Sequence, residues 1–229
     1  MSKGRKESFN DLLQSLKTKK VETPKSVDVI EERKYFLIVC EGVRTEPIYF
    51  NYFRNFLPPR LLDTIQVDGA GCDTIDVVKR AVEEKKKREK HKLKPPYDEV
   101  WAVYDKDDFS DTRYNGAIAL AKKEGIQSAH SNQSFELWYV LHFQYLDTAV
   151  QRKDYIPILS KNLGFPYMKN SERIVKTLFE SGKVKEAIAR AKKLDARYGG
   201  NAHAGFCPHT KVHELVTALL KYTRQPYIK

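Results

Sequence analysis

The sequence predicts an α/β fold in which helices cover both faces of a parallel sheet. Short apolar segments, rich in β-branched and aromatic residues, alternate with longer amphipathic segments through residues 35–143. Two of the apolar segments end directly in an acidic residue, Glu41 and Asp105. Alternation of strands with helices is the pattern of a parallel sheet joined by crossover helices.

Each element of this pattern has its own signals. The predicted strands are Tyr35–Cys40, Thr64–Val67, Glu99–Tyr104 and Ile126–His130. The predicted helices span residues 47–57, which Pro58-Pro59 end, and residues 73–94, 114–123 and 135–143. Pro47 suits a first helical turn, Asp73 suits an N-cap, and Asn132 or Ser134 is expected to cap the last of these helices.

The chain is expected to have three parts. Residues 1–34 are polar and predict a flexible arm, and residues 35–149 form the α/β domain. In residues 150–229 strand signals are scarce, and apolar residues recur at helical spacing, as in Val184, Ala187, Ile188, Ala191 and Leu194. We therefore expect a mainly helical C-terminal region.

The net charge of +11 predicts an anionic partner, and the distribution of this charge predicts that the partner binds the C-terminal region. Residues 35–149 hold 16 basic and 18 acidic side chains, a net −2, whereas residues 150–229 hold 16 and 6, a net +10. Apolar runs reach only roughly six residues, which is too short to span a bilayer, so no membrane partner is expected. The N-terminus lacks the apolar block of a secretory signal, and three widely spaced cysteines fit a reducing cytoplasm.

The acidic strand ends are the candidate site. Ligands of parallel α/β sheets gather at the carboxyl ends of the strands, where Glu41 and the pair Asp105 and Asp107 are expected. Carboxylates placed together are costly unless a cation neutralises them, and hard oxygen ligands suit Mg²⁺ or Mn²⁺. Alternatively, aspartates after a strand serve only as turn formers or helix caps. Glu136 has the same two interpretations, as an assisting acid or as a first-turn residue that favours the helix dipole.

Basic residues suggest where phosphate would bind. Arg44 follows the Glu41-Gly42 turn and is placed to meet a phosphate. A second group of candidate nucleic-acid contacts lies in the C-terminal region: Arg190, Lys192, Lys193, Arg197 and Lys211. The run Lys85–Lys94 is either a solvated helix end or a contact with a phosphate backbone.

The late histidines are a weaker candidate. His209 is a candidate general acid or phosphate contact. It could share a helix face with His213, four residues later, but a zinc site is not favoured because the sequence has no paired CxxC element.

These residues resemble two known families. Glu41-Gly42 followed by Thr45-Glu46, with Asp105-Lys106-Asp107 after a later strand, is similar to the Toprim domain of topoisomerases, primases and OLD-family nucleases. That resemblance covers about residues 35–130 and implies that Glu41, Asp105 and Asp107 hold a divalent metal during phosphodiester chemistry. A glycine often follows the aspartate pair in that family, whereas Asp108-Phe109 follow here.

A closer resemblance is to the RloB-like family of prokaryotic proteins. It rests on the segments Cys40–Tyr49, Tyr104–Phe109, Ser131–Phe143 and Pro208–Leu215. The resemblance implies a role in defence against phage through abortive infection. The resulting expectation is a cytoplasmic, metal-dependent nuclease that acts on nucleic acid, with RNA such as tRNA favoured, together with a possible partner protein of the defence system. The alternative is a non-catalytic subunit that binds nucleic acid or a partner.

Overall fold

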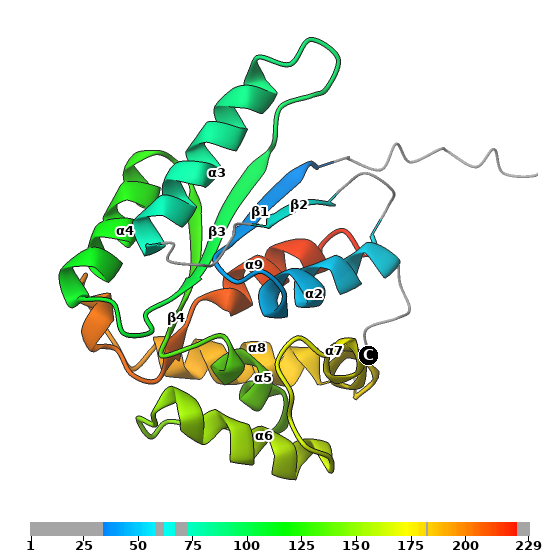
Figure 1. Cartoon of the computed structure of the whole chain (residues 1–229), viewed down its shortest axis with the longest axis vertical. Coiled ribbons are helices and arrows are strands. Elements are labelled where there is room, and N and C mark those ends of the chain that lie inside the picture. Colours follow the sequence, from blue (N-terminus) through cyan, green and yellow to red (C-terminus); the bar gives the residue numbers. More distant parts are fainter. Residues whose placement is uncertain (1–33, 58–61, 67–72, 182, 224–229) are drawn as a thin grey trace, which may run out of the picture. The chain divides into compact units, whose positions relative to one another are not determined.

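The computed structural model describes residues 34–57, 62–66, 73–181 and 183–223, and it confirms the predicted α/β class (Figure 1). The strands are β1 (Phe36–Cys40), β2 (Leu62–Gln66), β3 (Glu99–Asp105), β4 (Gln127–Asn132) and β5 (His209–Thr210). The predicted N-terminal arm, except Lys34, and the Pro58-Pro59 stop lie outside the described residues.

The strands form one sheet in the order β2-β1-β3-β4-β5. β1 pairs in parallel with both β2 and β3, β3 pairs in parallel with β4, and β5 is antiparallel to β4. Successive strands leave β1 in opposite directions, so the strand order reverses between β1 and β3. In parallel α/β sheets this reversal is where ligands bind, beyond the carboxyl ends of the strands.

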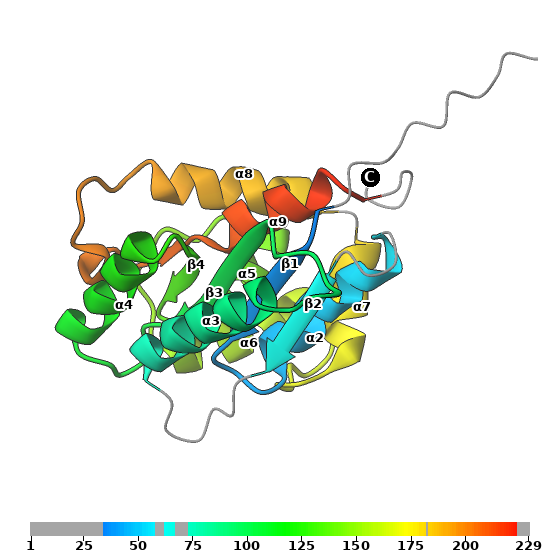
Figure 2. The same cartoon turned by 90° about the horizontal axis from the view of Figure 1, so that it is seen from above.

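Helices cover both faces of the sheet. The main helices are α2 (Thr45–Tyr52), α3 (Thr74–Glu89), α4 (Asp111–Lys123), α5 (Glu136–Phe143), α6 (Tyr155–Leu163), α7 (Glu172–Glu180), α8 (Val184–Asp195) and α9 (Val212–Leu220). Short 3₁₀ turns occupy Phe53–Asn55, Arg152–Asp154 and His203–Gly205. Figures 1 and 2 show α3 and α4 on one face, with α2 and α9 on the other.

The two faces of β1 enter two separate hydrophobic cores. Phe36, Ile38 and Cys40 pack with α2, α5 and α9, whereas Leu37 and Val39 pack with α3 and α4. All five residues of the strand are buried because side chains alternate between two covered faces. This explains why the segment reads as a continuous apolar run.

Local signals set several helix bounds as predicted, although α3 ends at Glu89 and not at residue 94. The Asp73 carboxylate accepts a hydrogen bond from the backbone N–H of Ile75 and begins α3, and Gly125, with a φ of +64°, follows α4. The predicted capping of α5 is wrong. Asn132 donates to the Ala204 carbonyl, and the Ser134 hydroxyl has no hydrogen-bond partner in the described part of the chain.

The region after residue 150 is mainly helical, as predicted, and it shares a core with the sheet. Leu159, Leu178, Ala187 and Val216 belong to the same buried cluster as Phe36. The sequence pattern missed β5, which is only two residues long and pairs with Ser131 and Asn132 of β4. No helix in the described ranges is long and apolar enough to cross a membrane.

Candidate metal and active site

Glu41 and Asp105 meet at the carboxyl edge of the sheet, where the strand order reverses. Glu41 directly follows β1, and Asp105 is the last residue of the neighbouring strand β3. The backbone N–H of Asp105 donates to Oε2 of Glu41 at 2.9 Å. The structure therefore brings together two of the three acids that the sequence proposes as metal ligands.

Asp105 is buried at this edge, and one of its two carboxylate oxygens is unpartnered in the described residues. Its side chain is 9% exposed, and its Oδ2 accepts a hydrogen bond of 2.9 Å from the backbone N–H of Phe135. Its Oδ1 is buried and has no hydrogen-bond partner among the described residues. Burial, followed by the negative charges of Glu46 and Asp107, raises the pKa of Asp105 well above its usual range.

Glu46 is a member of the site that the sequence interpretation did not propose. It lies in the first turn of α2 and is 6% exposed. Its carboxylate lies so close to Gly42 that a Cβ on that glycine would be 2.1 Å from Glu46 Oε2. The sequence did contain a clue to Glu46. It is a second glutamate, five residues after Glu41, at the start of the helix that follows the Glu41-Gly42 turn.

Glu41 and Glu46 both resist ionisation. Burial raises the pKa of Glu41 to about 7, although the hydrogen bond from Asp105 acts in the opposite direction. Burial also raises the pKa of Glu46 to about 7, and the negative charge of Glu136 adds to this effect. These two carboxyls therefore titrate near neutral pH, where a general base works best.

Asp107 and Glu136 are balanced by cations at the rim of the site. Asp107, with a φ of +43°, forms an ion pair of 2.5 Å with Arg152. Glu136 is 3% exposed, and its Oε1 accepts from the Tyr167 hydroxyl at 3.0 Å and lies 3.3 Å from Lys169 Nζ. Arg152 and Lys169 are themselves exposed, so the acidic centre has a basic rim.

The donor set partly fits a divalent metal. The carboxylate oxygens are hard ligands, and Asp105 Oδ1 is a buried donor without a partner. However, Glu41, Asp105 and Asp107 do not bring three ligand atoms within 4.8 Å of one another. Among the described residues, only Asp195, His213 and Glu214 do so. Asp105 with Glu41 and Glu46 does not converge within this distance either. It is nevertheless the better candidate set, because it contains the unpartnered Asp105 Oδ1, whereas Asp107 is already paired with Arg152.

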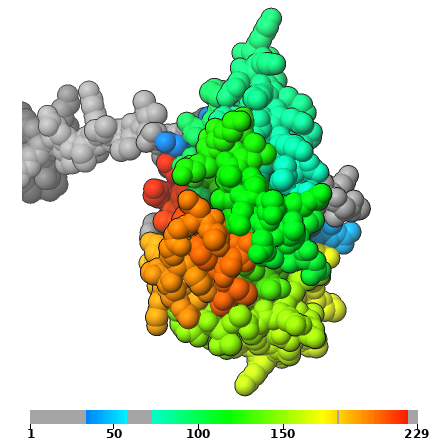
Figure 3. Space-filling model, turned by 90° about the vertical axis from the view of Figure 1, so that its left-hand side faces the viewer, coloured from blue at the N-terminus to red at the C-terminus, as the bar shows by residue number. Residues whose placement is uncertain are grey.

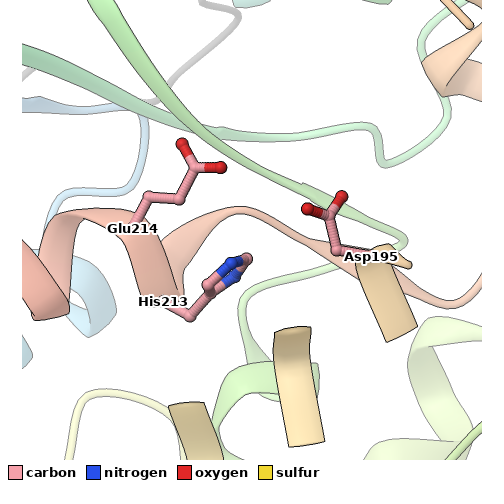
Figure 4. Close-up of side chains that lie close together, drawn as sticks. All are labelled: Asp195, His213 and Glu214. Atoms are coloured by element: carbon pink, nitrogen blue, oxygen red, sulfur yellow. The ribbon is translucent and has the colours of Figure 1, made fainter. Parts of the chain in front are cut away.

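The group of Asp195, His213 and Glu214, at the end of α8 and the start of α9, is not a good cation site (Figure 4). Lys211 Nζ lies 2.7 Å from Asp195 and 2.8 Å from Glu214, so an ammonium already neutralises both carboxylates. A metal would have to displace this lysine.

His209 does not join the acidic centre. It belongs to β5 and His213 to α9, so the prediction that they share a helix face is wrong. Its Nε2 is 2.8 Å from Asp195 Oδ1, and burial lowers the pKa of His209. These contacts give it a structural place beside α8.

Most of the predicted phosphate contacts of the C-terminal region already have partners within the chain. Arg190 donates to the carbonyls of Leu141 and His142 at the end of α5. Arg197 pairs with Asp147, and the Lys193 ammonium lies 4.3 Å from the centre of the Tyr145 ring. The side chain of Lys192 makes no hydrogen bond or ion pair in the described ranges, and neither does the side chain of Arg44 beside the acidic centre. These residues remain predictions as nucleic-acid contacts.

Comparison with known proteins places the chain in a family. A model of the RloB-like protein family matches residues 36–219, which include every acid of the centre. The chain belongs to the RloB-like protein family. The match extends from β1 to α9, so the region after residue 150 is part of what defines an RloB-like protein. No curated protein and no solved structure matches the chain.

Gly42 allows a direct test of the Glu46 position. An alanine Cβ would be 2.1 Å from Glu46 Oε2, far closer than atoms approach, so Gly42→Ala must displace this carboxylate. Because a misplacement of about 1 Å can cost about a hundredfold in rate, we expect the nucleic-acid cleavage that the sequence predicts to fall at least about tenfold, with the fold retained. Cleavage rate and thermal unfolding measure the two effects.

Gly116→Ala is the matched control, because its Cβ would meet Ile75 Cδ1 at an ordinary 3.8 Å. Full cleavage by Gly42→Ala would show that the position of Glu46 is unimportant.

Proposed function

We propose that this RloB-like protein is a divalent-metal-dependent nuclease whose reaction occurs at the Glu41–Asp105 edge. The observation that carries the proposal is the buried, unpartnered Asp105 Oδ1 among the carboxylates of Glu41 and Glu46. A protein does not keep such charges together without a cation or protons to offset their repulsion. The edge between β1 and β3 is also the place where this topology binds ligands.

The residues have distinct roles in this proposal. Asp105 would hold Mg²⁺ or Mn²⁺, with Glu41 and Glu46 as further donors, and Glu136 lies beside them. When bound, the metal supplies charge that stabilises a phosphodiester in its transition state and lowers the pKa of water. Glu41 is also placed at this edge to accept a proton from the attacking water. This division keeps Glu41 and Asp105 in the roles that the Toprim-like motifs imply and puts Glu46 in the place of Asp107.

Phosphate is held by the cations at the rim. Arg44 is exposed and precedes α2, and its side chain has no partner in the described ranges, so its guanidinium can bind a phosphate through two hydrogen bonds. Arg152 and Lys169 now balance Asp107 and Glu136, and a bound phosphate would compete for them. The proposed substrate is nucleic acid, with RNA such as tRNA favoured because the sequence has no duplex-reading helix-turn-helix motif. The proposed setting is anti-phage defence in the cytoplasm.

One observation favours a second function, a non-catalytic subunit that binds nucleic acid or a partner protein. Asp107 pairs with Arg152, and in the described residues no three acids of the centre bring ligand atoms within 4.8 Å of one another. Permanent pairing would leave a folded but inactive site.

The deciding experiment compares wild type with Asp105→Asn in cells and with purified protein. RNA and DNA ends are sequenced after expression, and purified wild type is incubated with RNA and DNA in Mg²⁺, Mn²⁺ or chelator. The nuclease predicts new ends only with wild type and cleavage that the chelator abolishes. Nucleic-acid binding without cleavage under every metal condition would favour the binding subunit.

A further inference from the structure

A basic arm projects from the sheet on the side away from the acidic centre. The arm comprises residues 85–98, the end of α3 and the loop to β3, and contains seven basic and two acidic side chains. Figures 1 and 3 show its tip standing out from the surface of the described chain. Residues 89–96 are all exposed.

The tip of the arm presents cations that have no partner. Lys90, Lys92 and Lys94 have no side-chain hydrogen bond or ion pair in the described part of the chain. Leu93, between two of them, is 91% exposed, the most exposed large apolar side chain among the described residues. By contrast, Lys87 pairs with Glu84 and Arg80 pairs with Glu83 and Glu84 nearer the sheet. Some of the cations of α3 are therefore paired within the helix, whereas the three lysines at the tip are not.

The base of the arm is fixed. Arg88 Nε donates to the Pro95 carbonyl at 2.7 Å, and its guanidinium lies 4.5 Å from the centre of the Tyr97 ring. The Asp98 carboxylate accepts from the backbone N–H of Tyr35 at 2.7 Å, which ties the end of the arm to the start of β1. The lysines and Leu93 are thus presented by a braced loop.

The arm and the acidic centre lie at opposite ends of α3. The helix begins at Thr74, near the carboxyl edge where Asp73 contributes to the field on Glu41, and it ends at the arm beside the start of β3. Its 16 residues span about 24 Å at about 1.5 Å per residue. A ligand that touches both ends must be at least this long, about seven nucleotides at about 3.4 Å each.

We infer that the arm binds the phosphate backbone of a nucleic acid whose scissile phosphate lies at the Glu41–Asp105 edge. This inference rests on the proposed function and makes the substrate an RNA long enough to reach both ends of α3. Three unpaired lysines within five residues, with no acid between them, match a chain of phosphates. The Leu93 side chain contacts bases or sugars exposed between those phosphates.

The test removes the three cations at the tip in an inactive background. Lys90→Ala, Lys92→Ala and Lys94→Ala are combined in full-length Asp105→Asn, and binding to single-stranded RNA is measured at several salt concentrations. With about 24 nucleotides of RNA, we expect Kd to rise about tenfold and the salt slope to fall by about 2, since three phosphate contacts at about 0.7 each are lost. About five nucleotides, which cannot span α3, should bind the Asp105→Asn parent more weakly than the long RNA, because they cannot reach both ends of the helix.

Two further variants test whether the effect depends on the position of the lysines and whether Leu93 contributes a separate apolar contact. Lys161→Ala, Lys176→Ala and Lys185→Ala together remove the same charge from exposed positions of α6, α7 and α8, and should leave the salt slope within experimental error. Leu93→Ser should weaken binding of the long RNA without changing the slope.

The outcomes distinguish this inference from the proposed nuclease. If the arm variant binds long RNA as tightly as its parent while wild type cleaves RNA, the arm is not a nucleic-acid contact and the nuclease stands. If wild type never cleaves but the arm variant loses affinity and slope, the arm inference stands without the nuclease. If the control triple variant lost as much affinity and salt slope as the arm variant, the effect would come from net charge alone, and the inference would be overturned.

Discussion

Asp105→Asn is expected to lower metal-dependent cleavage by at least about a hundredfold, because even residues that only support a metal ligand typically cost 10–100-fold. The substitution removes one negative charge while retaining an oxygen that can accept from the Phe135 N–H. The fold should therefore survive, and the loss should come from weaker metal binding. Single-turnover cleavage over a range of Mn²⁺ concentrations measures both rate and metal affinity.

Asp108→Asn is the matched control for this prediction. It makes the same chemical change three residues later, at an exposed position after the β3 edge. We expect its cleavage rate to stay within about threefold of wild type, because the Asp108 carboxylate is exposed and has no hydrogen bond or ion pair in the described residues, and its only effect on the site is a charge near Arg152. If Asp105→Asn cleaved as fast as Asp108→Asn, the carboxylate would have no part in catalysis, and the acidic centre would need another explanation.

The fold was predictable because its elements carry strong local signals. The segment Tyr35–Cys40 is apolar on both faces, which only a strand between two layers of helices requires. Glu41, which follows this segment, and Asp105, which ends a later strand, could be placed at one edge of the sheet because the carboxyl ends of parallel strands lie on the same side. β5 was not predictable, since two residues have no periodicity and their pairing with β4 is a tertiary contact.

The composition of the site was only partly predictable. Glu46 looked like an ordinary first-turn acid of α2, and its burial against Gly42 depends on how the helix returns over the sheet edge. Asp107 alternates with Asp105 in the sequence, but a φ of +43° and the ion pair to Arg152, 45 residues later, set its orientation. In the same way, the C-terminal cations looked free in the sequence because their partners, such as the α5 carbonyls for Arg190, are distant along the chain.

The acidic centre should also make stability without metal fall as pH rises. Burial raises the pKa of Glu41 and of Glu46 from 4.5 to about 7. Between these values the folded protein holds more protons than the unfolded chain, so raising the pH favours unfolding. The destabilisation is absent below the unfolded pKa, grows through this window and is complete above about pH 7.

Glu46→Gln isolates the contribution of one carboxyl. Because one pKa unit corresponds to about 1.4 kcal/mol, the variant should be more stable than wild type by about 3 kcal/mol at about pH 8 and equally stable at about pH 4. For a chain of this size that is about 6–12 °C in Tm, which thermal unfolding in chelator measures. Glu172→Gln, at an exposed first-turn position of α7, should change Tm little at either pH.

Divalent metal should make wild type more thermally stable than Glu46→Gln, the reverse of their order in chelator. A cation that binds the folded state alone raises Tm, and it does so more at about pH 8 than at about pH 5 because protons compete for the same carboxylates. Wild type should therefore gain more from Mn²⁺ than Glu46→Gln, which has lost a donor and the repulsion that binding relieves. Identical Tm profiles for both proteins, with and without Mn²⁺, would mean that Glu46 stays neutral and binds no metal. The proposal would then have to rest on Glu41 and Asp105 alone.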